Sequence, residues 1–371
     1  MGAGAAGIAV AATLAQRGIG CDVLERAPSL GSAWASRYDS LQLHTIRSLS
    51  GLPGFPIPRS YGRWVARDDV VRYLSACAAR SGVVPETGVE VTRVDRDDDG
   101  WRVQTSVGER RSRTVVFATG FSSKPYLPDW AGQDGAAHIP LLHSSEYRNP
   151  APYQGQSVLV VGAGNSAAEI AVDLSSAGID VTMSVRTPPN LVRRDTLGVP
   201  SQLLGIALRR VPERAMNPLS AALRRVSVPD LSAHGLPAPT GAMFTQFLAT
   251  GTVPILDHGF VQEVREGRIR IVPAVRSVSG EDVNLIDGAV IRPDAIICAT
   301  GYRPGLEPIL DHLNVLDERG TPRVHGARTL PLAPGLYFAG ITVQLAGLLR
   351  EIGIEASAIG AAIAREINAG V

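Results

Sequence analysis

Two glycine-rich turns, in well-separated parts of the sequence, constrain the fold of this chain more than any other feature. The first is Gly2-Ala3-Gly4-Ala5-Ala6-Gly7, and the second is Gly162-Ala163-Gly164-Asn165-Ser166-Ala167. Both fit the pattern G-x-G-x-x-G/A, in which small residues let a strand turn tightly into a helix whose N-terminal N–H groups meet a pyrophosphate. One such turn is a weak signal. Two of them predict a protein that brings two dinucleotides together.

The residues around each turn predict the helices and strands of a dinucleotide-binding unit. Apolar stretches that end at a glycine are typical of a helix packed on a sheet, and short continuous apolar runs are typical of buried parallel strands. The expected elements are a helix over 8–17 that stops at Gly18, a strand over 21–25, a strand over 157–161, a helix over 167–176 that stops at Gly178, and a strand over 180–185. The sequence therefore predicts an α/β fold with two Rossmann-like dinucleotide-binding domains.

Two similar strand ends and the proline-rich stretches set the expected domain boundaries. Ala118-Thr119-Gly120 and Ala299-Thr300-Gly301 each follow an apolar run, so each is expected where the chain leaves one domain for the other. The expected division is 1–150 and 303–371 for a discontinuous first domain, and 151–302 for a second domain inserted into it, with a helical or irregular insertion over about 196–250. Further expected elements are a helix over 69–80, a hairpin of 89–94 with 101–106, and a C-terminal helix over 347–364.

The residue that ends the second strand of each unit distinguishes the expected ligands. In the first unit it is Glu25, and a carboxylate at this place accepts hydrogen bonds from a ribose diol and repels a 2′-phosphate. That suits FAD or NAD. In the second unit it is Arg186, and a guanidinium there pairs with a 2′-phosphate through two hydrogen bonds and so favours NADPH. A solvated strand-end arginine is the alternative interpretation of Arg186.

Composition excludes several other classes of function. The 371 residues are 45% hydrophobic and 19% charged, which suits two domains with buried cores. The formal charge of +1 gives no electrostatic argument for a nucleic-acid or membrane partner, and no apolar run reaches the ~18 residues of a membrane span. Cys21, Cys77 and Cys298 form no CxxC pair, so neither a redox dithiol nor a metal site is predicted. Cys21 and Cys298 are both expected to be buried, and the enzyme is expected to be cytoplasmic.

With these motifs the chain resembles the class B flavin-containing monooxygenases, which are two-dinucleotide-binding flavoproteins, and it is most similar to their YUCCA-like branch and its bacterial relatives. The segments that carry the resemblance are Leu24-Glu25-Arg26, the G-x-x-W…Y…L-x-L-H-T residues Gly31, Trp34, Tyr38, Leu41, Leu43, His44 and Thr45, the strand ends 117–121 and 299–302, the runs 143–147 and 158–169, and residues 251–302. The resemblance implies FAD in the first domain and NADPH in the second. It also implies oxygenation of a small organic substrate through a flavin C4a-(hydro)peroxide formed with O₂.

The resemblance and the glycine motifs together indicate which residues bind the cofactors. The expected cofactor-binding residues are Gly2, Gly4, Gly7, Glu25, Arg26, Trp34, His44, Thr119 and Gly120 in the first domain, and Gly162, Gly164, Asn165, Ser166, Ala167 and Arg186 in the second. No Ser-His-Asp or metal-spaced cluster is evident, which agrees with chemistry carried by the cofactor. His44 is the one candidate catalytic residue.

Several residues also have a purely structural interpretation. His44 either tunes the oxygenated flavin by hydrogen bonding or is a structural histidine bonded to the backbone. Trp34 either covers the flavin or belongs to the core. His143 and Tyr147 either brace the linker against NADP or serve the structure alone. Glu169, one helical turn beyond the second glycine motif, is expected to be solvated or to cap the helix.

Three features depart from the family pattern. The fingerprint F-x-G-x-x-x-H-x-x-x-Y keeps its histidine and tyrosine, but Ala137 replaces the aromatic residue and Ile139 replaces the glycine. Residues 46–48 stand where many members have an asparagine near the flavin. Only Met1 precedes the first glycine turn, where a buried strand of ~5 residues is expected. Either the sequence begins late, or this central strand is missing and FAD is expected to bind less tightly.

The leading hypothesis is an NADPH-dependent FAD monooxygenase that acts on a small organic substrate and O₂, by heteroatom oxidation, hydroxylation or oxidative decarboxylation. One alternative is an NAD(P)H-dependent flavoprotein reductase of the disulfide reductase type, which needs a dithiol that this chain lacks. The other is an inactive cofactor-binding remnant without the first strand of the FAD domain. A homodimer is left open, and the sequence does not name the substrate.

Overall fold

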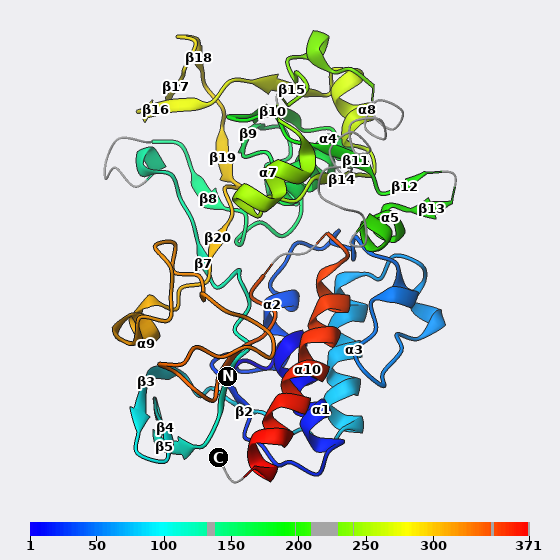
Figure 1. Cartoon of the computed structure of the whole chain (residues 1–371). Coiled ribbons are helices and arrows are strands. Elements are labelled where there is room, and N and C mark those ends of the chain that lie inside the picture. Colours follow the sequence, from blue (N-terminus) through cyan, green and yellow to red (C-terminus); the bar gives the residue numbers. More distant parts are fainter. Residues whose placement is uncertain (132–137, 197, 209–228, 240, 343–344, 370–371) are drawn as a thin grey trace. The chain divides into compact units, whose positions relative to one another are not determined.

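The chain folds into two compact units in a computed structural model that describes all residues except 132–137, 197, 209–228, 240, 343–344 and 370–371. The first unit comprises Met1–Ser36, Thr45–Lys124 and Tyr302–Val371, and the second comprises Arg37–His44 and Pro125–Gly301. Both units are of mixed α/β type, as predicted, and Figure 1 follows the chain through them.

The core of the second unit is a five-stranded parallel sheet. Its strands lie in the order β15 (Ile269–Val272), β10 (Asp180–Ser184), β9 (Ser157–Val161), β19 (Ala295–Cys298) and β8 (Leu141–His143). The second glycine turn joins β9 to α4 (Asn165–Ser176), which leads back to β10. This strand–turn–helix–strand order is the Rossmann-type unit that the sequence predicts, with the bounds of β9 as expected and β10 one residue shorter.

Smaller elements complete the second unit. They are the parallel pair β11 (Leu191–Arg193) and β14 (Ile255–Asp257), the antiparallel pair β12 (Asp195–Thr196) and β13 (Val199–Pro200), the antiparallel strands β16 (Val275–Ser279), β17 (Asp282–Leu285) and β18 (Val290–Ile291), and the helices α5 (Ser201–Leu208), α7 (Met243–Thr250) and α8 (Phe260–Arg265). The insertion predicted over 196–250 therefore contains α5 and α7, whereas its residues 209–228 lie outside the described residues.

In the first unit, the helix that follows the glycine turn packs against two other helices. Figure 1 shows α1 (Ala5–Ala15), α3 (Arg67–Arg80) and α10 (Leu348–Asn368) as neighbours. The contact between α1 and α10 is close, because a Cβ built on Gly360 would lie 2.6 Å from Cγ2 of Thr13. Within the described residues, no helix combines the length and the apolar character needed to cross a bilayer.

Met1 and Gly2 connect the short strands of the first unit. The strands are β1 (Leu24–Glu25) parallel to β2 (Glu86–Thr87), β6 (Val115–Phe117) parallel to β21 (Leu336–Phe338), and the antiparallel sheet of β3 (Val91–Asp97), β4 (Gly100–Thr105) and β5 (Gly108–Ser112). The amino group of Met1 donates to the Val116 carbonyl at 2.8 Å, and the Gly2 N–H donates to the Leu24 carbonyl at 2.7 Å. These two residues therefore lie between β6 and β1.

The structure corrects two predictions in this region. The strand predicted over 21–25 contains only Leu24 and Glu25, because Gly2 pairs with it at Leu24 and residues 19–22 have no strand partner on that side among the described residues. Cys21 is consequently exposed rather than buried, whereas Cys298 in the central strand β19 is buried as predicted. The predicted hairpin is present, extended by the third strand β5.

The division into units also differs from the predicted boundary near residue 150. Residues 125–150 belong to the second unit because β8 pairs with β19 in its central sheet. The short segment 37–44 belongs to the second unit as well, although the chain on either side of it belongs to the first. The remaining short elements are α2 (Ser32–Ala35), α9 (Glu307–Leu310), and β7 (Lys124–Pro125) paired with β20 (Tyr302–Arg303) where the chain passes between units.

Candidate functional site

The two glycine turns are built in the same way. Gly2 has a φ of +92° and Gly162 a φ of +139°, and residues other than glycine rarely adopt such values. A Cβ on Gly2 would lie 2.7 Å from the carbonyl oxygen of Ala118, and one on Gly162 would lie 2.3 Å from that of Ala299. Each turn is therefore packed against the alanine of its own Ala-Thr-Gly strand end, which explains why the two motifs recur together in the sequence.

The middle glycine of each turn faces open space. A Cβ on Gly4 or on Gly164 would meet no atom within 4 Å, whereas a Cβ on Gly7 would lie 1.8 Å from the carbonyl oxygen of Gly2. Ala167, at the place of the third glycine in the second turn, is fully buried and in contact with the Gly162 position. The open side is where a pyrophosphate approaches the backbone in this motif.

The helices that follow both turns begin without a capping side chain. Gly4 is the N-cap of α1 and Gly164 is the N-cap of α4, neither receives a side-chain capping hydrogen bond, and neither helix has an acidic residue in its first turn. Four N–H groups at a helix start lack intrahelical partners, and the helix dipole adds positive potential there. Both turns therefore fit an anionic pyrophosphate.

Thr119 supplies a further sign of a ligand at the first turn. Among the described residues its hydroxyl has no hydrogen-bond partner although it is buried, and its Cα lies 3.4 Å from the Cβ position of Gly2. The equivalent Thr300 donates its hydroxyl to the Tyr126 carbonyl at 2.5 Å. Because buried polar groups are nearly always hydrogen-bonded, the Thr119 hydroxyl fits a group supplied by a bound cofactor.

The strand-end residues lie as the motifs predict. Glu25 is 9% exposed, and its carboxylate accepts hydrogen bonds from the N–H groups of Ala3 at 2.6 Å and of Ala27 at 2.9 Å. These two hydrogen bonds hold the Glu25 carboxylate at the first turn, where a carboxylate suits a ribose diol. Arg186 follows β10 and is exposed, and Arg26 is exposed beside Glu25. Binding of ligand by these side chains stays a prediction.

The side chain of Asn165 serves the structure rather than facing a ligand. Its Nδ2 donates to the Pro254 carbonyl at 3.1 Å, and its Oδ1 accepts from the Leu256 N–H at 2.8 Å. These bonds tie the start of α4 to β14, and a nucleotide contact of Asn165 stays a prediction. The neighbouring Ser166 forms a side-chain hydrogen bond with Tyr38.

His143 and Tyr147 brace the second unit internally. The N–H of Ser145 donates to Nδ1 of His143 at 3.1 Å, so Nε2 carries the proton and donates to the Gly301 carbonyl at 3.0 Å. Burial lowers the pKa of His143, which keeps it neutral. Tyr147 is 1% exposed and donates to Asp173 on α4 at 2.8 Å. Both contacts support the structural interpretation, and Ala137 of the same fingerprint lies outside the described residues.

Glu169 is the residue that sequence reasoning missed. It is 8% exposed rather than solvated, and it does not cap the helix. Its Oε2 accepts from the Tyr38 hydroxyl at 2.6 Å, its Oε1 is hydrogen-bonded to Nε2 of His44, and Nε2 of His258 lies 3.9 Å from the same oxygen. His44 is therefore bonded to a buried carboxylate and not to the backbone. We call Tyr38, His44, Glu169 and His258 the Glu169 cluster.

The Glu169 cluster is arranged around an ionised carboxylate. Burial alone would raise the pKa of Glu169, but the charge of His44, the hydrogen bonds from His44 and Tyr38, and the nearby His258 hold it well below its usual range. Burial alone would lower the pKa of His44, but the charge of Glu169 and the hydrogen bond to it raise that pKa. Burial and Glu169 raise the pKa of Tyr38, which stays a neutral donor. The two pKa shifts thus both favour the pair of a carboxylate at Glu169 and a protonated His44.

The segment 37–44 that carries Tyr38 and His44 is held to the second unit along its length. The N–H of Asp39 donates to the Arg148 carbonyl at 2.8 Å, and Asn149 donates to the Asp39 carboxylate at 2.9 Å. The rings of Tyr38 and Tyr147 have centroids 6.2 Å apart. Trp34, three residues before this segment, is half-buried in α2 of the first unit, so its predicted place over a flavin stays a prediction.

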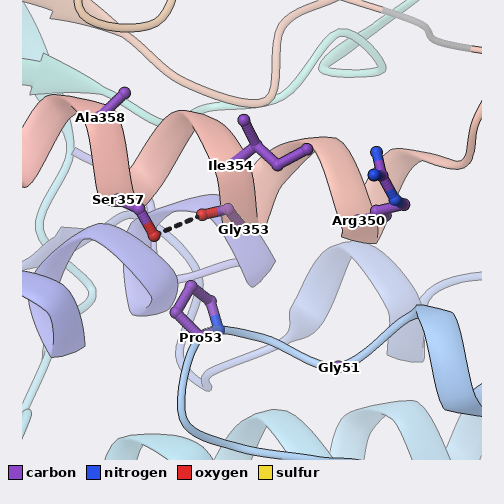
Figure 2. Close-up of a pocket in the computed structure, with 7 residues that line it drawn as sticks. All are labelled: Gly51, Pro53, Arg350, Gly353, Ile354, Ser357 and Ala358. Atoms are coloured by element: carbon purple, nitrogen blue, oxygen red, sulfur yellow. Dashed lines mark hydrogen bonds between the residues drawn. The ribbon is translucent and has the colours of Figure 1, made fainter. Parts of the chain in front are cut away.

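A pocket on the first unit is lined by residues that are far in the sequence from both glycine turns. Figure 2 shows it between α10 and the loop at Gly51 and Pro53, with a volume of about 590 Å³. Its charged lining residue, Arg350, pairs with Glu351 at 2.7 Å, and the Ser357 hydroxyl donates to the Gly353 carbonyl. Its polar side chains are thus engaged within α10, and we assign it no chemistry.

The fold and the paired turns define an oxidoreductase class that binds two dinucleotides. The pyridine nucleotide-disulphide oxidoreductase family model matches residues 1–199. The indole-3-pyruvate monooxygenase YUCCA1 of Oryza sativa subsp. japonica is 35% identical over 356 residues, covering 94% of this chain and 87% of the relative.

Solved structures share the fold. The flavin-containing monooxygenase from Stenotrophomonas maltophilia superposes with a TM-score of 0.72 at 24% identity, covering 97% of this chain and 96% of that one. The crystal structure of OTEMO in complex with FAD and NADP gives a TM-score of 0.73 at 17% identity, with coverage of 100% and 84%. The chain therefore belongs to the pyridine nucleotide-disulphide oxidoreductase family and, within it, to the flavin-dependent monooxygenases related to YUCCA proteins. The predicted family, fold class and enzyme class are confirmed.

Proposed function

We propose that this protein is an NADPH-dependent FAD monooxygenase that oxygenates a small organic substrate with O₂. The observation that carries the proposal is the pair of uncapped glycine turns with opposite charges at their strand ends, Glu25 for the first and Arg186 for the second. A disulfide reductase is not favoured, because the sequence relatives at 30–35% identity are indole-3-pyruvate monooxygenases and the sequence has no dithiol.

The side chains bind and orient the cofactors. The first turn, with Glu25 and the unpartnered hydroxyl of Thr119, would hold the FAD pyrophosphate and ribose. The second turn would hold the NADPH pyrophosphate, with Arg186 pairing with the 2′-phosphate. When bound, FAD reduced by NADPH supplies the oxygen chemistry, which no side chain of the protein provides.

We propose an aromatic 2-oxo acid as the first substrate to test, because relatives over most of the chain are indole-3-pyruvate monooxygenases. Oxidative decarboxylation of such an acid consumes O₂ and NADPH and releases CO₂, water, NADP⁺ and a carboxylic acid with one carbon fewer. Amines, sulfides and ketones are the other classes to include. A cytoplasmic location and a homodimer are further parts of the proposal, tested by cell fractionation and by light scattering.

The test is a coupled assay on purified protein reconstituted with FAD. We expect yellow protein whose NADPH oxidation and O₂ uptake rise together when the correct substrate is added, with product formed in proportion. Glu25→Gln is the test variant, because it keeps the size of the side chain but removes the charge and turns one of the two acceptor oxygens into an NH2 donor that faces a backbone N–H. It should retain less FAD. Colourless protein that cannot be reconstituted, or NADPH oxidation without oxygenated product across the panel, would contradict the proposal.

A further inference from the structure

The buried Glu169 carboxylate has an unusual set of cationic partners. Within the described part of the chain, the cationic groups within 4.0 Å of it are His44 and His258, and neither an arginine nor a lysine pairs with it. A guanidinium or ammonium partner would stay charged at every physiological pH, whereas histidine loses its charge near neutral pH. The charge balance at Glu169 therefore depends on a proton that can leave.

Glu169 also lies close to the second glycine turn. It is on α4, five residues after the N-cap Gly164, which places its Cα about 7 Å along the helix axis from the turn. The site proposed there binds a pyrophosphate, which is itself negatively charged. A buried carboxylate at that distance repels such a ligand.

The other charged and titratable groups around the pair of His44 and Glu169 are Tyr38, Arg37, Arg194, Asp173 and His258. Tyr38 donates a hydrogen bond to Oε2 as a neutral phenol, and the positive charge of Arg37 opposes the rise of the Tyr38 pKa. The positive charge of Arg194 repels a proton on His44 and so opposes the rise of the His44 pKa. On α4 itself, Asp173 is engaged by Tyr147. His258 is the second titratable group, 3.9 Å from the carboxylate, where it adds positive charge when protonated.

We propose that Glu169 is a positioning residue that holds His44 in its protonated form, and that loss of this proton weakens the binding of the nicotinamide dinucleotide at the second turn. The inference rests on the proposed function, because it takes that turn as the nucleotide site. The protonated pair is neutral and leaves the turn positive. The deprotonated pair carries a net negative charge about one and a half helical turns from the phosphates.

The sign of the effect follows directly. Glu169 raises the pKa of His44, so the proton is present at low pH and is lost as the pH rises through that raised value. Affinity for NADP⁺ should therefore fall as the pH rises. We expect the dissociation constant to rise about tenfold, which lies within the usual range of coupling between two sites.

The test is calorimetric titration of the FAD-loaded protein with NADP⁺ between about pH 6 and pH 9, a range centred above the ordinary pKa of histidine. Three proteins are compared: wild type, Glu169→Gln and Asp173→Asn. We expect the dissociation constant of wild type and Asp173→Asn to rise about tenfold across the range, and that of Glu169→Gln to stay nearly flat. Asp173→Asn is the matched control, because it removes a carboxylate of the same helix that is engaged by a tyrosine. Ionisation of the 2′-phosphate near pH 6 acts equally in all three proteins.

A second measurement, NMR titration of His44, reports the protonation of this residue without any ligand binding. The imidazole C–H signals of His44, assigned with His44→Gln, should titrate at a lower pH in Glu169→Gln than in wild type. If Glu169→Gln does not fold, as judged by circular dichroism, His44→Gln takes its place in the titration and should also give a flat profile. A flat wild-type profile, or an unchanged slope in both variants, overturns the inference but leaves the nucleotide site standing. Absence of NADP⁺ binding at every pH overturns the nucleotide site as well.

Discussion

Alanine substitutions at Gly4 and Gly7 separate the structural role of the first glycine turn from its proposed binding role. A methyl group on Gly7 would lie 1.8 Å from the Gly2 carbonyl oxygen, whereas contacts under 3.0 Å are essentially never found. The backbone must therefore shift to make room for the methyl group. It is not free to do so, because the Gly2 N–H is bonded to Leu24 and Met1 is bonded to Val116.

The expected cost of Gly7→Ala follows from this clash. Overpacking a buried site costs about 1–3 kcal/mol and sometimes more, and a fixed backbone favours the upper end. Alanine in the helix returns up to about 1 kcal/mol through its higher helix propensity. We therefore expect a net loss of about 2–3 kcal/mol, which lowers the melting temperature by roughly 4–12 °C. Gly4→Ala meets no atom within 4 Å and keeps an allowed φ of −81°, so its melting temperature should change by only a few degrees.

The two variants should differ in the opposite way in their flavin content. The methyl group of Gly4→Ala occupies the open side of the turn, where the pyrophosphate must approach the backbone. The assay measures the melting temperature of flavin-free protein by differential scanning fluorimetry, and then the ratio of FAD to protein after reconstitution and desalting. An unchanged melting temperature for Gly7→Ala would refute the packing argument. Full FAD retention by Gly4→Ala would refute the assignment of this turn to the pyrophosphate.

Three further predictions concern other parts of the chain. Arg186→Ala should raise KM for NADPH at least tenfold more than KM for NADH in steady-state assays, because only NADPH has the 2′-phosphate; equal effects on both would remove the argument for NADPH. Cys21 is exposed, whereas burial raises the pKa of Cys298 to about 12, so a thiol reagent should label Cys21 in the native protein while Cys298 stays unlabelled by mass spectrometry. Because Glu169 has a lowered pKa, its stabilising effect is complete above the ordinary carboxyl pKa and is lost as the pH falls. The urea-unfolding free energy of Glu169→Gln should therefore depend less on pH below about pH 5 than that of wild type.

The second unit could be predicted closely because its signals are local. The strand 157–161, the glycine turn and the helix that ends before Gly178 lie next to one another in the chain, and each has its own pattern of apolar residues. The boundary expected near residue 150 differs from the observed division because the pairing of β8 with β19 joins residues more than 150 positions apart, which no local pattern records.

The Glu169 cluster was missed for a similar reason. Tyr38 and His44 lie 131 and 125 positions before Glu169, so the sequence around Glu169 resembles any amphipathic helix with an exposed acid. One signal was available: the L-x-L-H-T segment contains a histidine and is preceded by a tyrosine, and both need partners if buried. Cys21 was misjudged because an apolar neighbourhood predicts burial only when another strand lies alongside.

The segment 37–44 has a consequence for how the protein can be divided and made. The polypeptide passes between the two units at residues 36/37, 44/45, 124/125 and 301/302, so residues 125–301 expressed as a separate fragment would lack Tyr38 and His44. The Glu169 carboxylate would then be buried without its main partners, which is strongly destabilising. During synthesis of the whole chain, residues 37–44 leave the ribosome long before α4 does, so Tyr38 and His44 are already present when Glu169 emerges. Strand β6 can pair with β21 only late in synthesis, because the first residue of β21 lies 221 positions after that of β6. The second unit can therefore be completed before the first, whose last residues are 302–371.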